Sequence, residues 1–227
     1  SSLINQGMVI LDGAKMSKSK GNLVLFQEEL DAHGADALRV SLAFAGPVED
    51  DKDWADVSTT GAAKFLARAL RVAHDVDSPV GVVFAGGDAG LRRVTHRLLA
   101  DAPGLVEQTK FNVLVARLME LVNAIRKTID SGAGASDPAV REAAETLAVM
   151  LDLIAPHSAE EMWEALGHEP SVGLVQWRSA DPALLIEDTV TTAVQVNGKV
   201  RTTLEVPAKI GDAELEKALT QPQQDPE

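Results

Sequence analysis

The chain has 227 residues, 45% of them hydrophobic, and a formal net charge of −13. This length allows one large domain or two smaller ones with a substantial core. The absence of cysteine excludes disulfides and thiolate metal sites and fits a cytoplasmic protein. The sequence has no secretory signal and no apolar run of about 18 residues, so we expect neither export nor membrane binding.

Charge is distributed unevenly along the chain. Basic residues exceed acidic ones in residues 1–22 and 61–130, whereas acidic residues dominate 23–60 and 131–227. The acidic total argues against nucleic-acid binding over the whole surface, but it allows a local basic face. The basic middle of the chain is where an anionic partner would dock.

The first elements are predicted to be a short strand and a lysine-rich loop. Met8 to Leu11 reads as a strand that leads to a turn at Asp12 and Gly13. The loop that follows, Gly13 to Asn22, holds three lysines and two serines in the sequence GAKMSKSKGN.

Helical spacing begins at Phe26, and Gly34 interrupts it, so we expect two helices joined near His33 and Gly34. Next comes a polar loop around Trp54. The glycine-rich stretch from Gly81 to Gly90 is predicted to be a connection, although its VGVVF sequence could be mistaken for a strand.

The middle of the chain is predicted to be a helical bundle, because apolar residues recur with helical spacing. The expected helices cover 60–76, 91–99, 109–129, 140–154 and 158–166. We expect the second of these to bend or end at Pro103 and Gly104.

Local signals predict where two of these helices start and stop. Asp137 is expected to cap a helix whose first residue is Pro138. Ser158 and Glu161 fit a capping box that opens the last helix of the bundle, and Gly167 would end it.

After Trp177 the pattern changes to alternating β-type residues. Two such runs flank Asn197 and Gly198, a strong hairpin signal, and a helix is expected from Gly211, followed by a disordered tail. We therefore predict a mainly α fold: a lysine loop that leads into an α-helical bundle, with a small C-terminal β-hairpin. The predicted divisions are 1–60, 61–180 and 181–227.

The lysine-rich loop from Gly13 to Asn22, called the lysine loop here, has two possible interpretations. It could be a solvated, flexible loop. It could also be a phosphate clamp, because glycine lets the backbone approach an anion, serine hydroxyls donate hydrogen bonds and lysines supply positive charge. The spacing of a Walker loop is absent.

The residues Lys15-Met16-Ser17-Lys18-Ser19 match the complete KMSKS signature of class I aminoacyl-tRNA synthetases. Further segments resemble the leucyl-tRNA synthetase family, and their order is preserved. They are GADALRVSLAFAGPVEDDKDW at 34–54, FNVLVARLMELVNAI at 111–125, APHSAEEMWEALGH at 155–168 and VQVNGKVRTTLEVPA at 194–208. The resemblance implies a bundle of the anticodon-binding-domain type found in class Ia synthetases.

The resemblance also implies ATP-dependent activation of leucine and its transfer to tRNA(Leu). By motif position, Lys18 is the main candidate for a catalytic ATP-phosphate contact, with Lys15 supporting it. Ser17 and Ser19 are ATP-binding candidates that can donate hydrogen bonds, whereas Met16 is expected to anchor the loop. Mg²⁺ would arrive with ATP, and we expect no dedicated protein metal site.

Lys64, Arg68 and Arg71 fall at i, i+4 and i+7 on one side of a helix. They are either a solvated face or a site that binds the tRNA backbone. A second, weaker cluster is formed by Arg92, Arg93 and Arg97.

Other candidates have stronger structural explanations. His157 and Glu161 could suggest a metal site, but helix-start capping is favoured. Trp163 and Trp177 are expected in the core. Asp50, Asp51 and Asp53 around Trp54 could suggest a cation site, but a polar loop anchored by the tryptophan is favoured.

Three functions remain open. The chain could be part of a leucine–tRNA ligase, a stand-alone tRNA-binding relative without catalysis, or part of a valyl, isoleucyl or methionyl enzyme. The intact KMSKS sequence favours an enzyme, and the segments at 34–54 and 194–208 favour the leucyl one. Because the HIGH signature, the nucleotide fold and the editing domain have no counterpart here, we expect the isolated chain to be an inactive fragment. We also expect the protein to be monomeric.

Overall fold

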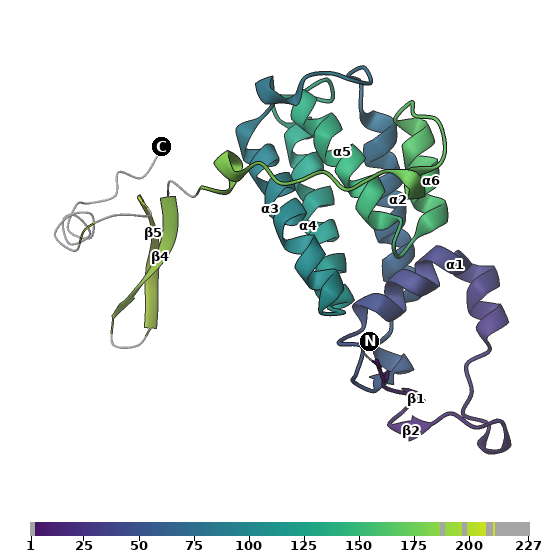
Figure 1. Cartoon of the computed structure of the whole chain (residues 1–227). Coiled ribbons are helices and arrows are strands. Elements are labelled where there is room, and N and C mark those ends of the chain that lie inside the picture. The colour runs from purple at the N-terminus through teal and green to yellow at the C-terminus, as the bar shows by residue number, and fades with distance from the viewer. Residues whose placement is uncertain (1–2, 187–188, 197–198, 208–210, 212–227) are drawn as a thin grey trace. The chain divides into compact units, whose positions relative to one another are not determined.

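The computed structural model describes residues 3–186, 189–196, 199–207 and 211. The chain divides into two compact units, Ser1–Ala180 and Asp181–Glu227. The main elements, shown in Figure 1, are α-helices, which confirms the predicted mainly α fold. In chain order, the helices and strands are β1 Val9–Leu11, β2 Ala14–Lys15, α1 Phe26–Phe44, β3 Lys52–Asp53, α2 Thr59–Asp75, α3 Ala89–Glu107, α4 Phe111–Asp130, α5 Pro138–Leu151, α6 Pro156–Ala165, β4 Thr189–Val196 and β5 Lys199–Pro207.

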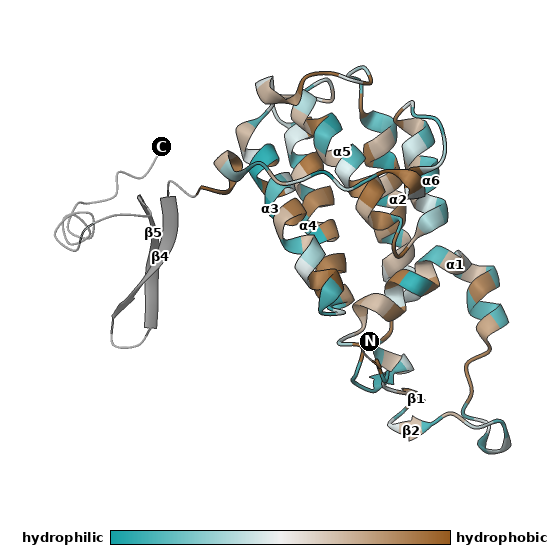
Figure 2. Ribbon diagram, viewed as in Figure 1, coloured by the Kyte–Doolittle hydropathy of each residue, from teal (hydrophilic) through white to brown (hydrophobic). Residues whose placement is uncertain are grey.

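Helices α2 to α6 form the bundle, by which we mean residues 59–180. Each helix turns one apolar side toward its neighbours, and Figure 2 shows hydrophobic and hydrophilic residues alternating along the helices. Many of the largest side chains with no exposed surface lie on α4 and α5, among them Leu114, Leu118, Leu121, Ile125 and Leu147. Burying one such side chain contributes about 1.5–3 kcal/mol. Trp163 is buried and Trp177 packs against this core, as predicted.

Local sequence signals define the start of α5 and the end of α6. Asp137 caps α5 by accepting a hydrogen bond from the Ala139 N–H at 2.7 Å, and Pro138 is the first helical residue, as predicted. Gly167 ends α6 with φ +86°. Its N–H donates to the Glu164 carbonyl and the next N–H donates to the Trp163 carbonyl, which is a Schellman ending.

Two predicted boundaries are wrong. Of the two outcomes predicted at Pro103, a bend or an end, the end is wrong: α3 continues to Glu107, where Leu105 and Val106 pack against the core. The α6 helix starts at Pro156, so Ser158 lies inside it and does not cap it. The cap comes instead from another helix, as Asp36 of α1 accepts a hydrogen bond from the Ser158 N–H at 2.6 Å.

The segment before the bundle, residues 3–58, is called the N-terminal module here. It contains a three-stranded sheet in the order β2-β1-β3, in which β1 pairs antiparallel with β2 and parallel with β3. The predicted strand at 8–11 is confirmed, but β3 was expected to be loop. Helix α1 breaks where expected, because Gly34 has non-helical angles of φ 81° and ψ 165°.

The second half of α1 docks on the bundle. Arg39 donates hydrogen bonds to the carbonyls of Ile154 and Leu153, in the connection between α5 and α6, at 2.7 and 3.3 Å. Asp36 binds the start of α6, so the two side chains of α1 satisfy backbone groups on both sides of the α5–α6 corner.

The second unit contains the predicted hairpin. Strands β4 and β5 pair antiparallel from Thr189↔Pro207 to Val196↔Lys199, with an irregularity at Val194 and Gln195. The turn at 197–198 and the helix predicted from residue 211 onward lie outside the described residues, except for Gly211 itself. The boundaries predicted at 60 and 180 stay predictions. None of the described helices is long and apolar enough to cross a membrane.

Candidate functional site

The lysine loop is presented by the β1–β2 hairpin. The turn between the strands places Asp12 and Gly13 in the left-handed region, with φ 52° and 71°. Two consecutive residues with positive φ are typical of a type I′ turn, whose twist matches that of the strands. The hairpin pairs Ile10 with Lys15, so the first lysine of the loop has a defined place on the sheet.

The carboxylate of Asp53 holds this turn from the other side of the sheet. Oδ1 accepts a hydrogen bond from the Asp12 N–H at 3.1 Å, and Oδ2 accepts one from the Gly13 N–H at 2.6 Å. Asp53 also accepts from the Ala55 N–H at 3.1 Å. The bond from Gly13, with the bonds from Ala55 and Asp12, stabilises the charged form and lowers the pKa of Asp53.

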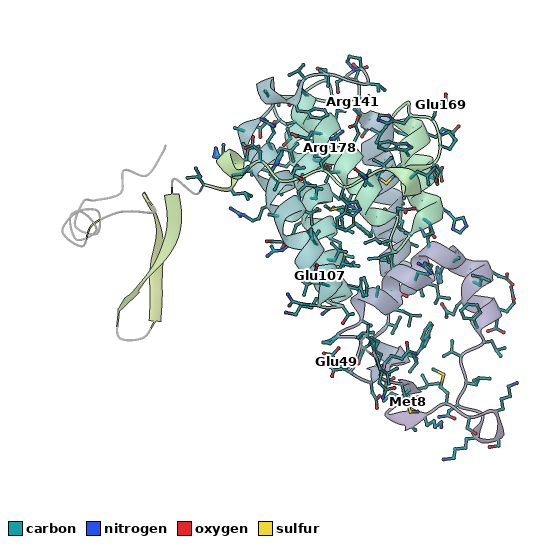
Figure 3. The ribbon with its side chains drawn as sticks, in the orientation of Figure 1. Met8, Glu49, Glu107, Arg141, Glu169 and Arg178 are labelled. Atoms are coloured by element: carbon teal, nitrogen blue, oxygen red, sulfur yellow. The ribbon has the colours of Figure 1, made fainter. Side chains whose placement is uncertain are left out.

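A second carboxylate acts in the same way at the start of β1. Asp51 Oδ1 accepts a hydrogen bond from the Met8 N–H at 2.7 Å, and Met8 is labelled in Figure 3. In the acidic loop around Trp54, the carboxylates of Asp51 and Asp53 therefore accept hydrogen bonds from backbone N–H groups at the start of β1 and in the turn. Among the described residues, no group of three or more His, Cys, Asp and Glu side chains could hold a metal ion.

The loop itself contains a single 3₁₀ turn, Lys18–Lys20. Gly21 ends this turn with φ +70°, a conformation that favours glycine, and its N–H donates to the Lys18 carbonyl at 3.3 Å. The hydroxyls of Ser17 and Ser19 lie 2.9 Å apart and share a hydrogen bond. The two serines therefore shape the loop by contacting each other.

Asn22 closes the base of the loop. Its Oδ1 accepts a hydrogen bond from the Ser17 N–H at 3.0 Å, and its Nδ2 donates to the Lys15 carbonyl at 3.1 Å. From the sequence we assigned no role to Asn22 and placed Asp53 in a polar loop. For Asn22 a signal was present, because asparagine side chains in loops commonly bond to nearby backbone.

The three lysines of the loop, Lys15, Lys18 and Lys20, are exposed. Within the described part of the chain, none of their ammonium groups makes an ion pair or a hydrogen bond. Three uncompensated positive charges on a loop with a braced base can bind an anion such as a phosphate.

The predicted basic stripe lies on α2, where Lys64, Arg68 and Arg71 are all exposed. Arg68 donates a hydrogen bond to the Asn123 side chain of α4, whereas no hydrogen bond or ion pair within the described residues engages the side chains of Lys64 and Arg71. The stripe is therefore a surface with at least two available cations.

The second predicted cluster does not form a common surface. Arg92 donates to Glu142 at 2.8 Å in a pair with little exposure, so it stabilises the interior of the bundle. Glu142 also faces His96 at 3.0 Å. Spacing along α3 cannot show that a buried carboxylate of α5 lies opposite Arg92.

Glu145 is the centre of a larger buried network that the sequence pattern does not reveal. Its carboxylate lies 3.4 Å from Arg141, 3.0 Å from His168 and 2.6 Å from Arg178. Arg141 also donates to the carbonyl of Leu166 at 2.9 Å, and Figure 3 labels Arg141 and Arg178. This network joins α5 to the segment after α6 and is structural.

His157 and Glu161 form no metal site in the described structure. The Nδ1 atom of His157 lies 3.1 Å from Asp36 Oδ1, next to the bond that caps α6. The polar contact of His157 therefore belongs to the docking of α1, while Asp36 supplies the cap.

Comparison with known families matches both parts of this arrangement. A model of the anticodon-binding domain of tRNA ligase matches residues 88–217, and a model of class I tRNA synthetases (M) matches residues 1–63. The first match covers more than half of the chain, so the chain belongs to the family of anticodon-binding domains of tRNA ligases.

Within that class, the similar proteins are leucine–tRNA ligases. The chain is 66% identical over 214 residues to the leucine–tRNA ligase of Leifsonia xyli, which covers 94% of this chain and 25% of that protein. It is 61% identical over 216 residues to the leucine–tRNA ligase of Clavibacter sepedonicus, with 95% and 25% covered. The chain thus spans about a quarter of the length of these curated relatives.

Two solved structures share the fold. A ternary complex of Agrobacterium radiobacter LeuRS with tRNA and LeuAMS matches with a TM-score of 0.76 at 25% identity, covering 95% of this chain and 28% of that one. A Mycobacterium tuberculosis methionyl-tRNA synthetase with methionyl-adenylate matches with a TM-score of 0.59 at 22% identity, covering 74% and 40%. The second likeness concerns the fold alone.

Proposed function

We propose that the chain is part of a leucine–tRNA ligase, which activates leucine with ATP and transfers it to tRNA(Leu). The observation that carries the proposal is the complete KMSKS sequence at residues 15–19, displayed on a braced loop with exposed lysines. The similarity to leucine–tRNA ligases supports the choice of leucine over valine, isoleucine or methionine.

The loop would contact the phosphates of ATP. Forming the adenylate builds negative charge on the departing pyrophosphate, and a positioned lysine stabilises that charge more than it stabilises the bound substrate. Lys18, on the 3₁₀ turn, is the proposed catalytic contact, with Lys15 in support. Ser17 and Ser19 would donate to phosphate oxygens or keep the loop in shape. Mg²⁺ would be held by the phosphates of ATP.

The bundle would dock tRNA(Leu). Lys64, Arg68 and Arg71 present their charges on the outer side of α2, and phosphate contacts of this kind position a nucleic acid without reading its sequence. The similar leucyl enzyme was solved with tRNA, which supports this assignment. Cytoplasmic location and a monomeric state stay predictions.

By itself, this chain should not activate leucine. It supplies the lysine loop, but its sequence contains no HIGH signature to complete an ATP site. The test is leucine-dependent exchange of pyrophosphate into ATP. A rate clearly above that of a buffer blank from this chain alone would contradict the assignment.

In the complete ligase, Lys18→Ala should lower kcat for this exchange by about 10²–10³, the size expected for a contact made in the transition state. The KM for leucine should change little. Lys20→Ala is the matched control, because it removes an equally exposed lysine from the same 3₁₀ turn. Equal losses in the two variants would show that the loop needs only positive charge, and that Lys18 has no special role.

A filter-binding salt series tests the tRNA face. Replacing Lys64, Arg68 and Arg71 with alanine should weaken tRNA(Leu) and unrelated tRNAs by similar factors. Each phosphate contact that the substitutions remove should lower the slope of log affinity against log salt by about 0.7–0.9. Lys127→Ala, at an exposed position on α4, is the charge control. An unchanged affinity and slope would mean that the stripe is a solvated face.

The alternative is a stand-alone tRNA-binding relative without catalysis. Such a binder would have the basic stripe but no use for an ATP-phosphate loop, so the intact KMSKS sequence favours the ligase. A Lys18→Ala variant with an unaltered function in the cell would favour the alternative.

A further inference from the structure

Asp53 is the one side chain of the described structure that bonds to both residues of the turn before the lysine loop. Its two oxygens accept from the N–H groups of Asp12 and Gly13 at 3.1 and 2.6 Å. The aspartate lies about 40 residues further along the chain, on β3, so the contact ties two distant segments together.

This contact reinforces a conformation that the Asp12–Gly13 sequence already favours in a two-residue hairpin turn. Asp12 has φ +52°, in the left-handed region, which aspartate adopts more readily than most other residues that carry a side chain. In a two-residue turn the amide groups need partners, and water is the alternative. A fixed carboxylate that accepts both amides selects this conformation over others.

The effect reaches the loop through the sheet. Ile10 of β1 pairs with Asp53 on one side and with Lys15 on the other. The carbonyl of Lys15 then accepts from Asn22, which also binds the Ser17 N–H. A shift in the turn would therefore move both ends of the loop that carries Lys18.

We propose that Asp53 is a positioning residue for the lysine loop: its carboxylate fixes the Asp12–Gly13 turn and thereby places Lys15 and Lys18 for the phosphates of ATP. The inference rests on the proposed function for the identity of the anion. Its structural part, that the carboxylate orders the loop, can be tested independently.

The structural test is amide hydrogen exchange on the 227-residue chain. In Asp53→Asn, which keeps the size of the side chain but leaves one oxygen to accept, the amides of Asp12 and Gly13 should exchange about tenfold faster or more. The Ser17 amide, inside the loop, should also exchange faster. Asp50→Asn is the control, because it removes the same charge from the same loop, and no hydrogen bond or ion pair within the described residues engages the Asp50 carboxylate.

The functional test uses the complete ligase. A displacement of about 1 Å can cost a hundredfold in rate, so Asp53→Asn should lower kcat for leucine-dependent pyrophosphate exchange by about ten- to a hundredfold. The KM for leucine and the thermal midpoint should stay near those of the parent. Asp53→Glu, which keeps a carboxylate, should recover part of the activity.

Two results would overturn the inference. One is faster exchange at Asp12 and Gly13 with no change at Ser17, which would confine the effect to the turn. The other is a lower thermal midpoint with an unchanged kcat, which would make Asp53 merely structural. A parent ligase with no leucine-dependent exchange would contradict the proposed function instead, and the Ser17 amide would still decide whether Asp53 orders the loop.

Discussion

The bundle and the N-terminal module are stabilised in different ways. In the bundle, α4 and α5 present side chains such as Leu118 and Leu147 with no exposed surface. In the module, no described residue before Asp36 is fully buried, and large apolar side chains such as Leu25 and Phe26 are 50% and 64% exposed. The bundle is held by a core to which α1 contributes Ala37 and Val40, whereas the sheet of the module is braced by carboxylates that accept backbone N–H groups.

This difference predicts where each part is sensitive to mutation. Changes inside the bundle should affect the cooperative unfolding of the whole helical unit. Changes at the carboxylates of the module should loosen local structure and leave the core intact, because local opening can occur at a lower free energy than global unfolding.

The largest expected effect is in the bundle, at Glu145. Replacing it with alanine would leave Arg141 buried without its carboxylate and should lower the free energy of unfolding by about 3–5 kcal/mol. Urea denaturation followed by circular dichroism measures the change. Glu120→Ala is the matched control, since Glu120 pairs with Arg117 on the surface and should contribute at most about 1 kcal/mol. Equal effects of the two substitutions would contradict a stabilising role for the buried network.

A smaller effect is expected at the junction of the two parts. Asp36→Ala removes the acceptor of the Ser158 N–H and should cost about 1.5–3 kcal/mol, the range for hydrogen bonds to a charged group. Hydrogen exchange should accelerate in α1 and at the start of α6, while the amides of α4 keep their protection. Asp31→Ala is the control, because within the described residues the exposed Asp31 carboxylate accepts a hydrogen bond only from Gln27. Uniform loss of protection would mean that α1 is part of the cooperative core.

The smallest effect should be stabilising. Burial, together with the charges of Glu160 and Asp36, raises the pKa of Asp152 above its ordinary value of 3.8. The folded state thus disfavours the charged carboxylate, which also sits at the C-terminal end of α5. Asp152→Asn should therefore raise stability at neutral pH by about 0.3–1 kcal/mol.

The effect of this substitution should depend on pH. Since the folded pKa of Asp152 is raised, the penalty is present in full above that pKa and is lost as pH falls below the ordinary value of 3.8, where the carboxyl is protonated in both states. The gain from asparagine should shrink over the same range in thermal melts. A gain that persists at acidic pH would point to packing and not to charge.

The features that could be predicted from the sequence are those that depend on nearby residues, as most of the bundle does. Helices of the bundle follow from apolar periodicity, and the ends of α5 and α6 follow from Asp137, Pro138 and Gly167, whose signals are local. The signature in the lysine loop identified its lysines, although their contacts stay predictions. Each of these inferences used residues close together in the chain.

The features that were missed depend on contacts between distant segments. Strand β3 has two residues and exists because it pairs with β1, some 40 positions earlier. Asp36 replaced Ser158 as the partner of α6 from more than a hundred residues away. Spacing along one helix cannot show which carboxylate of another helix lies opposite, so the ion pairs of Arg92 and Glu145 could not be predicted.

The break at Gly34 limits which changes in length the chain can accept. A Cβ atom at this position would meet no atom within 4 Å, so the glycine is required by its backbone angles and not by crowding. The residues before Gly34 connect it to the lysine loop. After Gly34, the side chains of Asp36 and Arg39 are bound to the α5–α6 corner. Because each helical residue turns the chain by about 100°, a one-residue insertion between Gly34 and Asp36 would aim the preceding segment in another direction. Insertions should therefore not be tolerated at this junction.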